Sequence, residues 1–253
     1  MTREQLQQYF PDTYRFFAEA PDTHPFWKGV QHVHLDDARA GGTLLSDLEQ
    51  VFSSLFLVDG HHVVKDHLQE VNTHDELMKL LTTLYVAYLY RNHGARLTQG
   101  KTGYDIELEI ADQLLAMGIV HFHNFDAPHI QFAEAIEDEL AHMETLQQGA
   151  EAAQTPNVDD DVEAFLQHLK HHATDFPEHD AASHQVLAAI TPYASFEHEV
   201  ALAKKIQQDP TTMRKYFPHL AGIVLIDPKA GNERATFVSF HGENPDLEML
   251  LNK

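Results

Sequence analysis

The chain of 253 residues contains 39 Asp and Glu against 17 Lys and Arg, has 20 histidines and no cysteine, and carries a formal net charge of −22 at pH 7. The lack of cysteine excludes a disulfide framework and a thiolate zinc site, and no apolar run approaches the roughly 18 residues that span a bilayer. Hydrophobic residues make up 43% of the chain, enough for a packed core, and the start of the sequence lacks the apolar stretch of a signal peptide, so we expect a cytoplasmic protein without a membrane partner.

The acidic charge has two interpretations. Scattered carboxylates indicate halophilic adaptation to a salty cytoplasm, where screening acts within about 3 Å at 1 M salt. The alternative is an acidic surface for a protein partner, or a mimic of DNA charge. We favour salt adaptation, because the acids do not form one long block. The same charge repels nucleic-acid backbones, so charge does not support a nucleic-acid partner.

The histidines make this charge sensitive to mild acid. With an unperturbed pKa near 6.5, roughly three quarters of them carry a proton at pH 6, which brings the net charge to about −7.

Residues 1–60 are predicted to be an irregular N-terminal part with short helices, because prolines interrupt the pattern. Residues 4–10 read as a short helix and residues 31–36 as a short strand. Apolar residues recur at helical spacing over 44–58, which predicts a longer helix.

Residues 73–125 form the clearest unit of the sequence. Thr73 and Glu76 have the spacing of a capping box, apolar positions then follow a helical period, and Gly94 supplies a left-handed stop. Two strands over 95–98 and 104–110 make a hairpin, and 118–125 reads as a third strand.

The remaining chain is expected to be helical from 128 to 217, with strands only after it. Helices are predicted over 130–148, 158–171, 181–190 and 196–207. Strands follow at 220–226 and 235–241, and a terminal helix at 245–251, within the late part 218–253. Together these elements predict one α/β domain over 1–253, with a central mixed β-sheet flanked by helices and a long helical insertion.

A long helix ending in Gly, a hairpin with an acidic residue after its turn, and a strand with alternating polar residues resemble the PD-(D/E)XK nuclease superfamily, which has the restriction-endonuclease-like fold. The matching stretch is TLYVAYLYRNHGARLTQGKTGYDIELEI followed by GIVHFHNF, and LAGIVLIDPKAGNERATFVSFHGENP resembles the late strands. The resemblance implies a divalent metal held by an acidic residue on the second core strand and a Glu-x-Lys on the third, where the metal activates water for attack on a phosphodiester. Asp105 takes the first position, but His121 and His123 occupy the Glu and Lys positions, and Thr83 lies near the position of a helical Glu.

Asp105, His121 and His123 are therefore the candidate catalytic and metal-binding residues. Imidazole in place of carboxylate weakens a Mg²⁺ site, so the leading hypothesis is a nuclease-like protein without standard nuclease activity that acts as a binding or structural module. The alternative is a hydrolase or nuclease that uses Mn²⁺, Zn²⁺ or Fe²⁺, because residues two apart on a strand point to one face. Asp126 or His129 would complete that site.

Other constellations carry less weight. His32, His34 and Asp36 resemble the opening strand of amidohydrolases, but the predicted helical region leaves no room for eight βα units. Glu139 and His142 have di-iron spacing without a second copy. Histidine content alone explains the remaining pairs, His61 with His62 and His171 with His172. Basic residues that could contact phosphate at a sheet edge are Arg91, Arg96 and Lys101.

Overall fold

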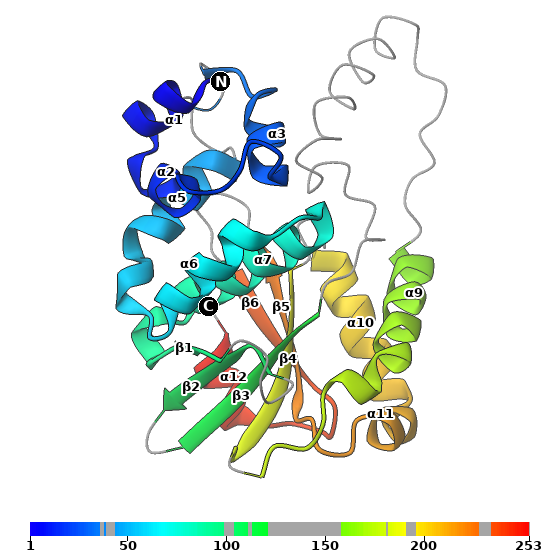
Figure 1. The fold of residues 1–253 in the computed structure, drawn as a ribbon. Coiled ribbons are helices and arrows are strands. Elements are labelled where there is room, and N and C mark those ends of the chain that lie inside the picture. Colours follow the sequence, from blue (N-terminus) through cyan, green and yellow to red (C-terminus); the bar gives the residue numbers. More distant parts are fainter. Residues whose placement is uncertain are drawn as a thin grey trace, which may run out of the picture.

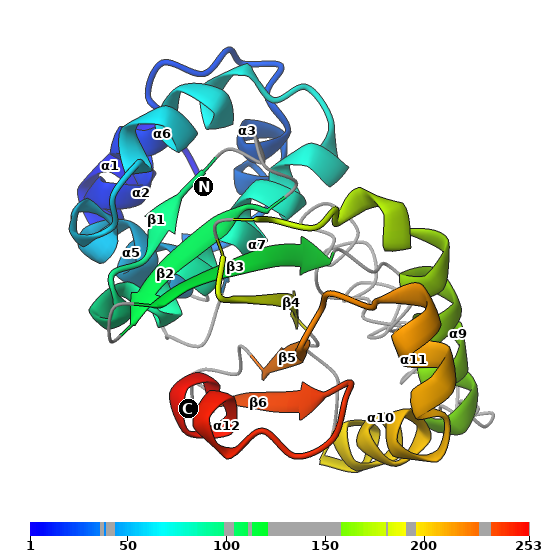
Figure 2. The ribbon, with the colours of Figure 1, turned by 90° about the horizontal axis from the view of Figure 1, so that it is seen from below.

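The computed structural model describes residues 1–35, 38, 44–98, 104–110, 113–120, 158–180, 182–190, 196–227 and 234–252. They form an α/β fold in which a six-stranded mixed sheet lies between two helical layers (Figures 1 and 2). The strands are β1 (Arg96–Leu97), β2 (Ile106–Ile110), β3 (Gln113–Val120), β4 (His184–Ile190), β5 (Gly222–Asp227) and β6 (Arg234–Ser239).

The spatial order of the strands follows the chain, β1-β2-β3-β4-β5-β6. The pairs β1–β2, β2–β3 and β5–β6 are antiparallel, whereas β3–β4 and β4–β5 are parallel. Parallel neighbours need a crossover connection, and the helices between these strands belong to such connections. A central parallel trio is thus flanked by antiparallel strands on both sides.

One layer contains the N-terminal helices and α7, and the other contains the crossover helices (Figure 1). The first layer comprises α1 (Arg3–Tyr9), α2 (Pro11–Phe17), α3 (Pro25–Val30), α5 (Leu44–Ser54), the 3-10 turn η1 (Leu55–Leu57), α6 (His61–Glu70) and α7 (His74–Leu89), with η2 (Arg91–His93) after it. The second comprises α9 (Val158–His171), η3 (Ala173–Asp175), α10 (Phe196–Gln208) and α11 (Pro210–Tyr216). The terminal helix α12 (Pro245–Leu251) packs on the first side, where the buried hydroxyl of Tyr90 donates to the Leu251 carbonyl. Among the described helices, none combines the length and apolar character that a bilayer crossing requires.

Strand residues alternate between two hydrophobic cores. On β3, Met117 and Ile119 pack with the N-terminal helices and α7, whereas Ala116 and Val120 pack with α9 to α11. Because both faces are covered, the central strands read as nearly continuous apolar runs instead of alternating ones.

The predicted helix–hairpin–strand arrangement is confirmed in its order and pairing. The hydroxyl of Thr73 accepts the N–H of Glu76, and the Glu76 carboxylate accepts the N–H of Asn72, which closes the start of α7. Gly94 has a φ of +64°, the left-handed conformation that the sequence predicted after this helix.

Three sequence predictions are wrong. The helix over 181–190 is instead the strand β4, and the third strand begins at Gln113, five residues earlier than expected. Residues 31–35 contain no strand. The expected helical segment 128–217 is accordingly interrupted by β4 in the middle of the sheet. A short apolar run of Val, Leu and Ala fits a buried strand and a buried helix equally well by periodicity, and burial between β3 and β5 decides it.

Candidate functional site

Asp105 lies immediately before β2, at the edge of the sheet where β3 ends. Its N–H donates to the Met117 carbonyl at 3.1 Å and its carbonyl accepts the N–H of Thr98 at 3.0 Å. Its carboxylate oxygen Oδ2 accepts the N–H of Ile119 at 2.8 Å. The side chain therefore gives β3 a hydrogen-bond acceptor just before the first residue of β2. Burial raises the pKa of Asp105, while the hydrogen bond from Ile119 and the charge of Lys79 act in the opposite direction.

The partners predicted for Asp105 cannot be placed beside it. His121 and His123 follow Val120 in the sequence and lie outside the described residues, as do Asp126 and His129. On α7, Thr83 is buried and its hydroxyl donates to the Lys79 carbonyl one turn earlier.

An aromatic ring covers Gly118, the residue of β3 that lies level with Asp105. Ile106 pairs with Met117, so Asp105 lies level with Gly118 on β3. A Cβ atom at Gly118 would lie 2.5 Å from Cδ1 of Phe176, which is itself buried. The absence of a side chain at Gly118 therefore admits the Phe176 ring against the strand.

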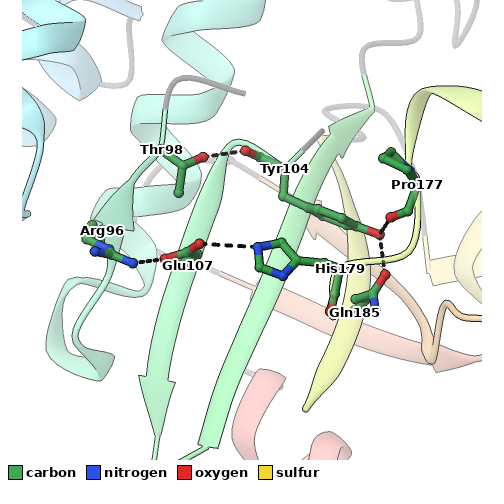
Figure 3. Close-up of polar contacts among 7 residues, drawn as sticks. All are labelled: Arg96, Thr98, Tyr104, Glu107, Pro177, His179 and Gln185. Carbon is green, nitrogen blue, oxygen red and sulfur yellow. Dashed lines mark hydrogen bonds and ion pairs between the residues drawn. The ribbon is translucent and has the colours of Figure 1, made fainter. Parts of the chain in front are cut away.

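A set of contacts around the buried side chain of Glu107, which we call the Glu107 cluster, lies on the same sheet (Figure 3). Its members are Arg96, Thr98, Tyr104, Glu107, Pro177, His179 and Gln185. Glu107 points to the face opposite Ile106 and Leu108, and its side chain is 7% exposed. One carboxylate oxygen pairs with the guanidinium of Arg96 on β1, and the other lies 3.6 Å from Nε2 of His179.

The ring of His179 covers the cluster from the segment before β4. Its side chain is 11% exposed, and Nε2 has no hydrogen-bond partner among the described residues. The distance of 3.6 Å to Glu107 exceeds that of a hydrogen bond but leaves an ion pair when the imidazole is protonated.

Tyr104 joins the same segment to the sheet. Its hydroxyl lies 2.6 Å from Oε1 of Gln185 and 2.9 Å from the Pro177 carbonyl, and its single proton serves one of them at a time. Gln185 in turn donates to the His179 carbonyl at 3.4 Å, and the hydroxyl of Thr98 donates to the Tyr104 carbonyl. Burial, reinforced by the charge of Glu178, raises the pKa of Tyr104.

The Glu107 cluster was missed by the sequence reasoning. Glu107 and Arg96 were placed correctly on neighbouring strands, and an acid opposite a base across a hairpin is a signal for an ion pair. His179 and Gln185 carried no such signal, because Gln185 was assigned to a helix over 181–190 and His179 to the stretch before that helix. The contacts of the cluster join groups of the protein, and they hold the segment before β4 against β1 and β2.

The basic candidates Arg91 and Arg96 make contacts within the protein, His32 and His34 are exposed, and several other candidates lie outside the described residues. The guanidinium of Arg91 donates to the Tyr88 carbonyl and lies 3.9 Å from the centre of its ring, and Arg96 is paired with Glu107. Lys101, Asp36, Glu139 and His142 are outside the described part. Within that part, no three His, Asp or Glu side chains converge in a way that could hold a metal ion.

Comparison of the chain with family models, curated proteins and solved structures found no match.

Proposed function

We propose that the protein is a binding or structural module on a nuclease-like α/β scaffold that does not cleave phosphodiesters by the standard metal mechanism. The observation that carries this proposal is the hydrogen bonding and burial of the Asp105 carboxylate. Its carboxylate accepts a backbone N–H inside the sheet, and burial raises its pKa. Oδ2 is thus used within the sheet, whereas a metal ligand would need its lone pairs for the ion.

The surroundings of Asp105 support the same proposal. The sheet surface level with it is covered by Phe176, which packs against Gly118 on the side of α9. The Glu107 cluster consists of contacts between protein groups that hold a segment in place. Such contacts stabilise a scaffold without requiring a substrate.

The charge of the chain bears on the partner of this module. A net charge of −22 repels nucleic-acid backbones, so a basic protein surface is the partner that acidity favours. If the basic partner surface is one that normally binds DNA, the protein acts as a mimic of DNA charge.

A nuclease assay tests the proposal. DNA and RNA substrates are incubated with wild type and with the variants Asp105→Asn, Asp105→Ala and His121→Ala, in Mg²⁺ and in Mn²⁺. We expect that none of these three substitutions abolishes a metal-dependent cleavage. Instead, Asp105→Ala should lower the free energy of unfolding by about 1–3 kcal/mol, because the N–H of Ile119 loses its acceptor. Asp105→Asn keeps an acceptor oxygen and should cost less.

The alternative is a hydrolase or nuclease that uses Asp105, His121 and His123 with Mn²⁺, Zn²⁺ or Mg²⁺. One observation favours it: Asp105 lies at the edge where the parallel strands β3 and β4 end, and ligands of α/β sheets bind at the carboxyl ends of such strands. Cleavage in Mn²⁺ that both Asp105→Asn and His121→Ala abolish, in folded proteins, would establish this alternative and reject the module.

A further inference from the structure

His168 in the last turn of α9 and His172, the residue that follows the helix, lie one helical turn apart. The carbonyl of His168 accepts the N–H of His172 at 3.1 Å, which is the bond of a helical turn. Their ring centres are 4.5 Å apart with an interplanar angle of 43°. Residues four apart share one helix face, so the sequence places both imidazoles over the same patch of surface.

A carboxylate orients the second of these rings. Nδ1 of His172 lies 2.8 Å from Oδ2 of Asp175. A carboxylate accepts but does not donate, so Nδ1 carries the proton, and in the neutral ring the lone pair is on Nε2. Histidines that bind metals usually donate their other N–H to such a group. The side chains of His172 and Asp175 are 42% and 59% exposed, so ions in solution can reach them.

We propose that His168 and His172 form a two-imidazole chelate for a divalent transition-metal ion, with Asp175 orienting His172. Two imidazoles that bind one ion at about 2.0–2.1 Å have ring centres roughly 4.5–5 Å apart, and the pair already has this separation. Water completes the coordination, because no third His, Asp or Glu converges there among the described residues.

Charges of both signs surround the two rings. The last turn of a helix exposes carbonyl groups at the negative end of its dipole and Asp175 adds a negative charge, whereas Lys170 in the same turn adds a positive charge. Imidazole nitrogen suits Cu²⁺, Ni²⁺ and Zn²⁺, whereas Mg²⁺ prefers oxygen ligands. We therefore expect Cu²⁺ to bind most tightly and Mg²⁺ not to bind.

Because the chain has 20 histidines, the experiment must report metal binding at His168 and His172 separately from binding elsewhere. Sub-stoichiometric Cu²⁺ is added to the full-length protein, and the broadening of assigned backbone amide signals is followed by NMR. In the wild type we expect broadening over residues 168–175. His168→Gln and His172→Gln should each remove it, and should weaken Cu²⁺ affinity at this position about 100-fold, since a chelate loses its effective concentration.

Two further variants control the experiment. Asp175→Asn should weaken binding about 10- to 100-fold while leaving both ligands in place. His61→Gln is the matched control, because His61 and His62 are adjacent on α6 and Nδ1 of His61 lies 2.8 Å from the Val58 carbonyl. It should leave the broadening over 168–175 unchanged, as should His121→Gln.

The proposal is overturned if sub-stoichiometric Cu²⁺ leaves the signals of 168–175 sharp in the wild type. It is equally overturned if the broadening persists in folded His168→Gln and His172→Gln proteins, with the fold checked by their remaining amide signals. Neither result depends on nuclease activity, so failure here leaves the proposed function untouched.

Discussion

Gly118 lies on β3 beneath the ring of Phe176, on the face of the sheet that α9 covers. An added Cβ would come within 2.5 Å of one ring carbon and 2.6 Å of another. We predict that Gly118→Ala lowers the free energy of unfolding by about 1–3 kcal/mol, because the ring must move within a packed core. Chemical denaturation measures the loss.

The double variant Gly118→Ala with Phe176→Leu is the control for this contact. A smaller side chain at position 176 makes room for the new methyl group, so Phe176→Leu should cost less in the Gly118→Ala protein than in the wild type. Additive costs in the two backgrounds would mean that Phe176 is not what excludes a side chain at this position.

His24 gives a residue-scale link between stability and pH. It is buried, its Nδ1 accepts the N–H of Phe26, and its Nε2 lies 2.7 Å from the Leu68 carbonyl. Burial lowers its pKa, while the contact with Leu68 opposes this shift. The unfolded chain then binds a proton near pH 6.5 that the folded chain resists, so stability is present above about 6.5 and falls as pH drops toward the folded pKa.

Urea denaturation at pH 7.5 and pH 5.5 tests this link by comparing wild type with His24→Gln. The wild type should lose more stability between the two pH values, because the variant lacks the buried imidazole. Asp47 and Asp105, whose pKa values are raised by burial, titrate alike in both proteins and cancel in the difference. An equal loss in the two proteins would contradict the assignment.

At the scale of elements, α2 depends on a neighbouring helix for its N-terminal cap. Its own N-cap residue, Phe10, makes no side-chain cap. Glu49 on α5 instead accepts the N–H groups of Asp12 and Thr13 at 3.0 and 2.8 Å, and the Thr13 hydroxyl at 2.7 Å. The carboxylate satisfies donors that a helix start leaves open and lies at the positive end of the dipole.

We predict that Glu49→Ala lowers the free energy of unfolding by about 2 kcal/mol, at the upper end of capping effects, because Thr13 is buried and loses its partner. Glu76→Ala is the matched control. Its carboxylate reaches the exposed N–H of Asn72 at 3.4 Å, so its loss should cost less in the same denaturation experiment. Equal costs would show that the contact between α5 and α2 adds nothing beyond local capping.

An element could be predicted from the sequence where the residues that define it are close together in the chain. The start of α7 is encoded by Thr73, which the structure confirms, whereas Gly94 ends the 3-10 turn η2 that follows the helix. The strand β4 was missed because its identity depends on burial between β3 and β5, which separate stretches of chain provide. The sequence proposed Asp105 as a candidate metal ligand, but its hydrogen bond to Ile119 depends on the register of β2 and β3. The same reason hid His179, which meets Glu107 only because β4 lies beside β3.

At the scale of the whole molecule, the acidic charge opposes folding through self-repulsion, which salt screens. We predict that the melting temperature rises between 0.1 and 3 M NaCl at pH 7.5. At pH 6 the rise should be smaller, because protonation of histidines makes the net charge of −22 less negative. Thermal melting across this grid, with sucrose as the uncharged control, separates charge screening from general exclusion effects.

The comparison between pH values is what distinguishes the two interpretations of the charge. If self-repulsion limits stability, the salt dependence must weaken as the histidines titrate, and sucrose must act equally at both pH values. A melting temperature that does not respond to salt at pH 7.5 would instead mean that the carboxylates lie far enough apart to be tolerated without screening. Salt adaptation would then no longer account for 39 acidic residues, and a basic partner would become the better explanation of the surface.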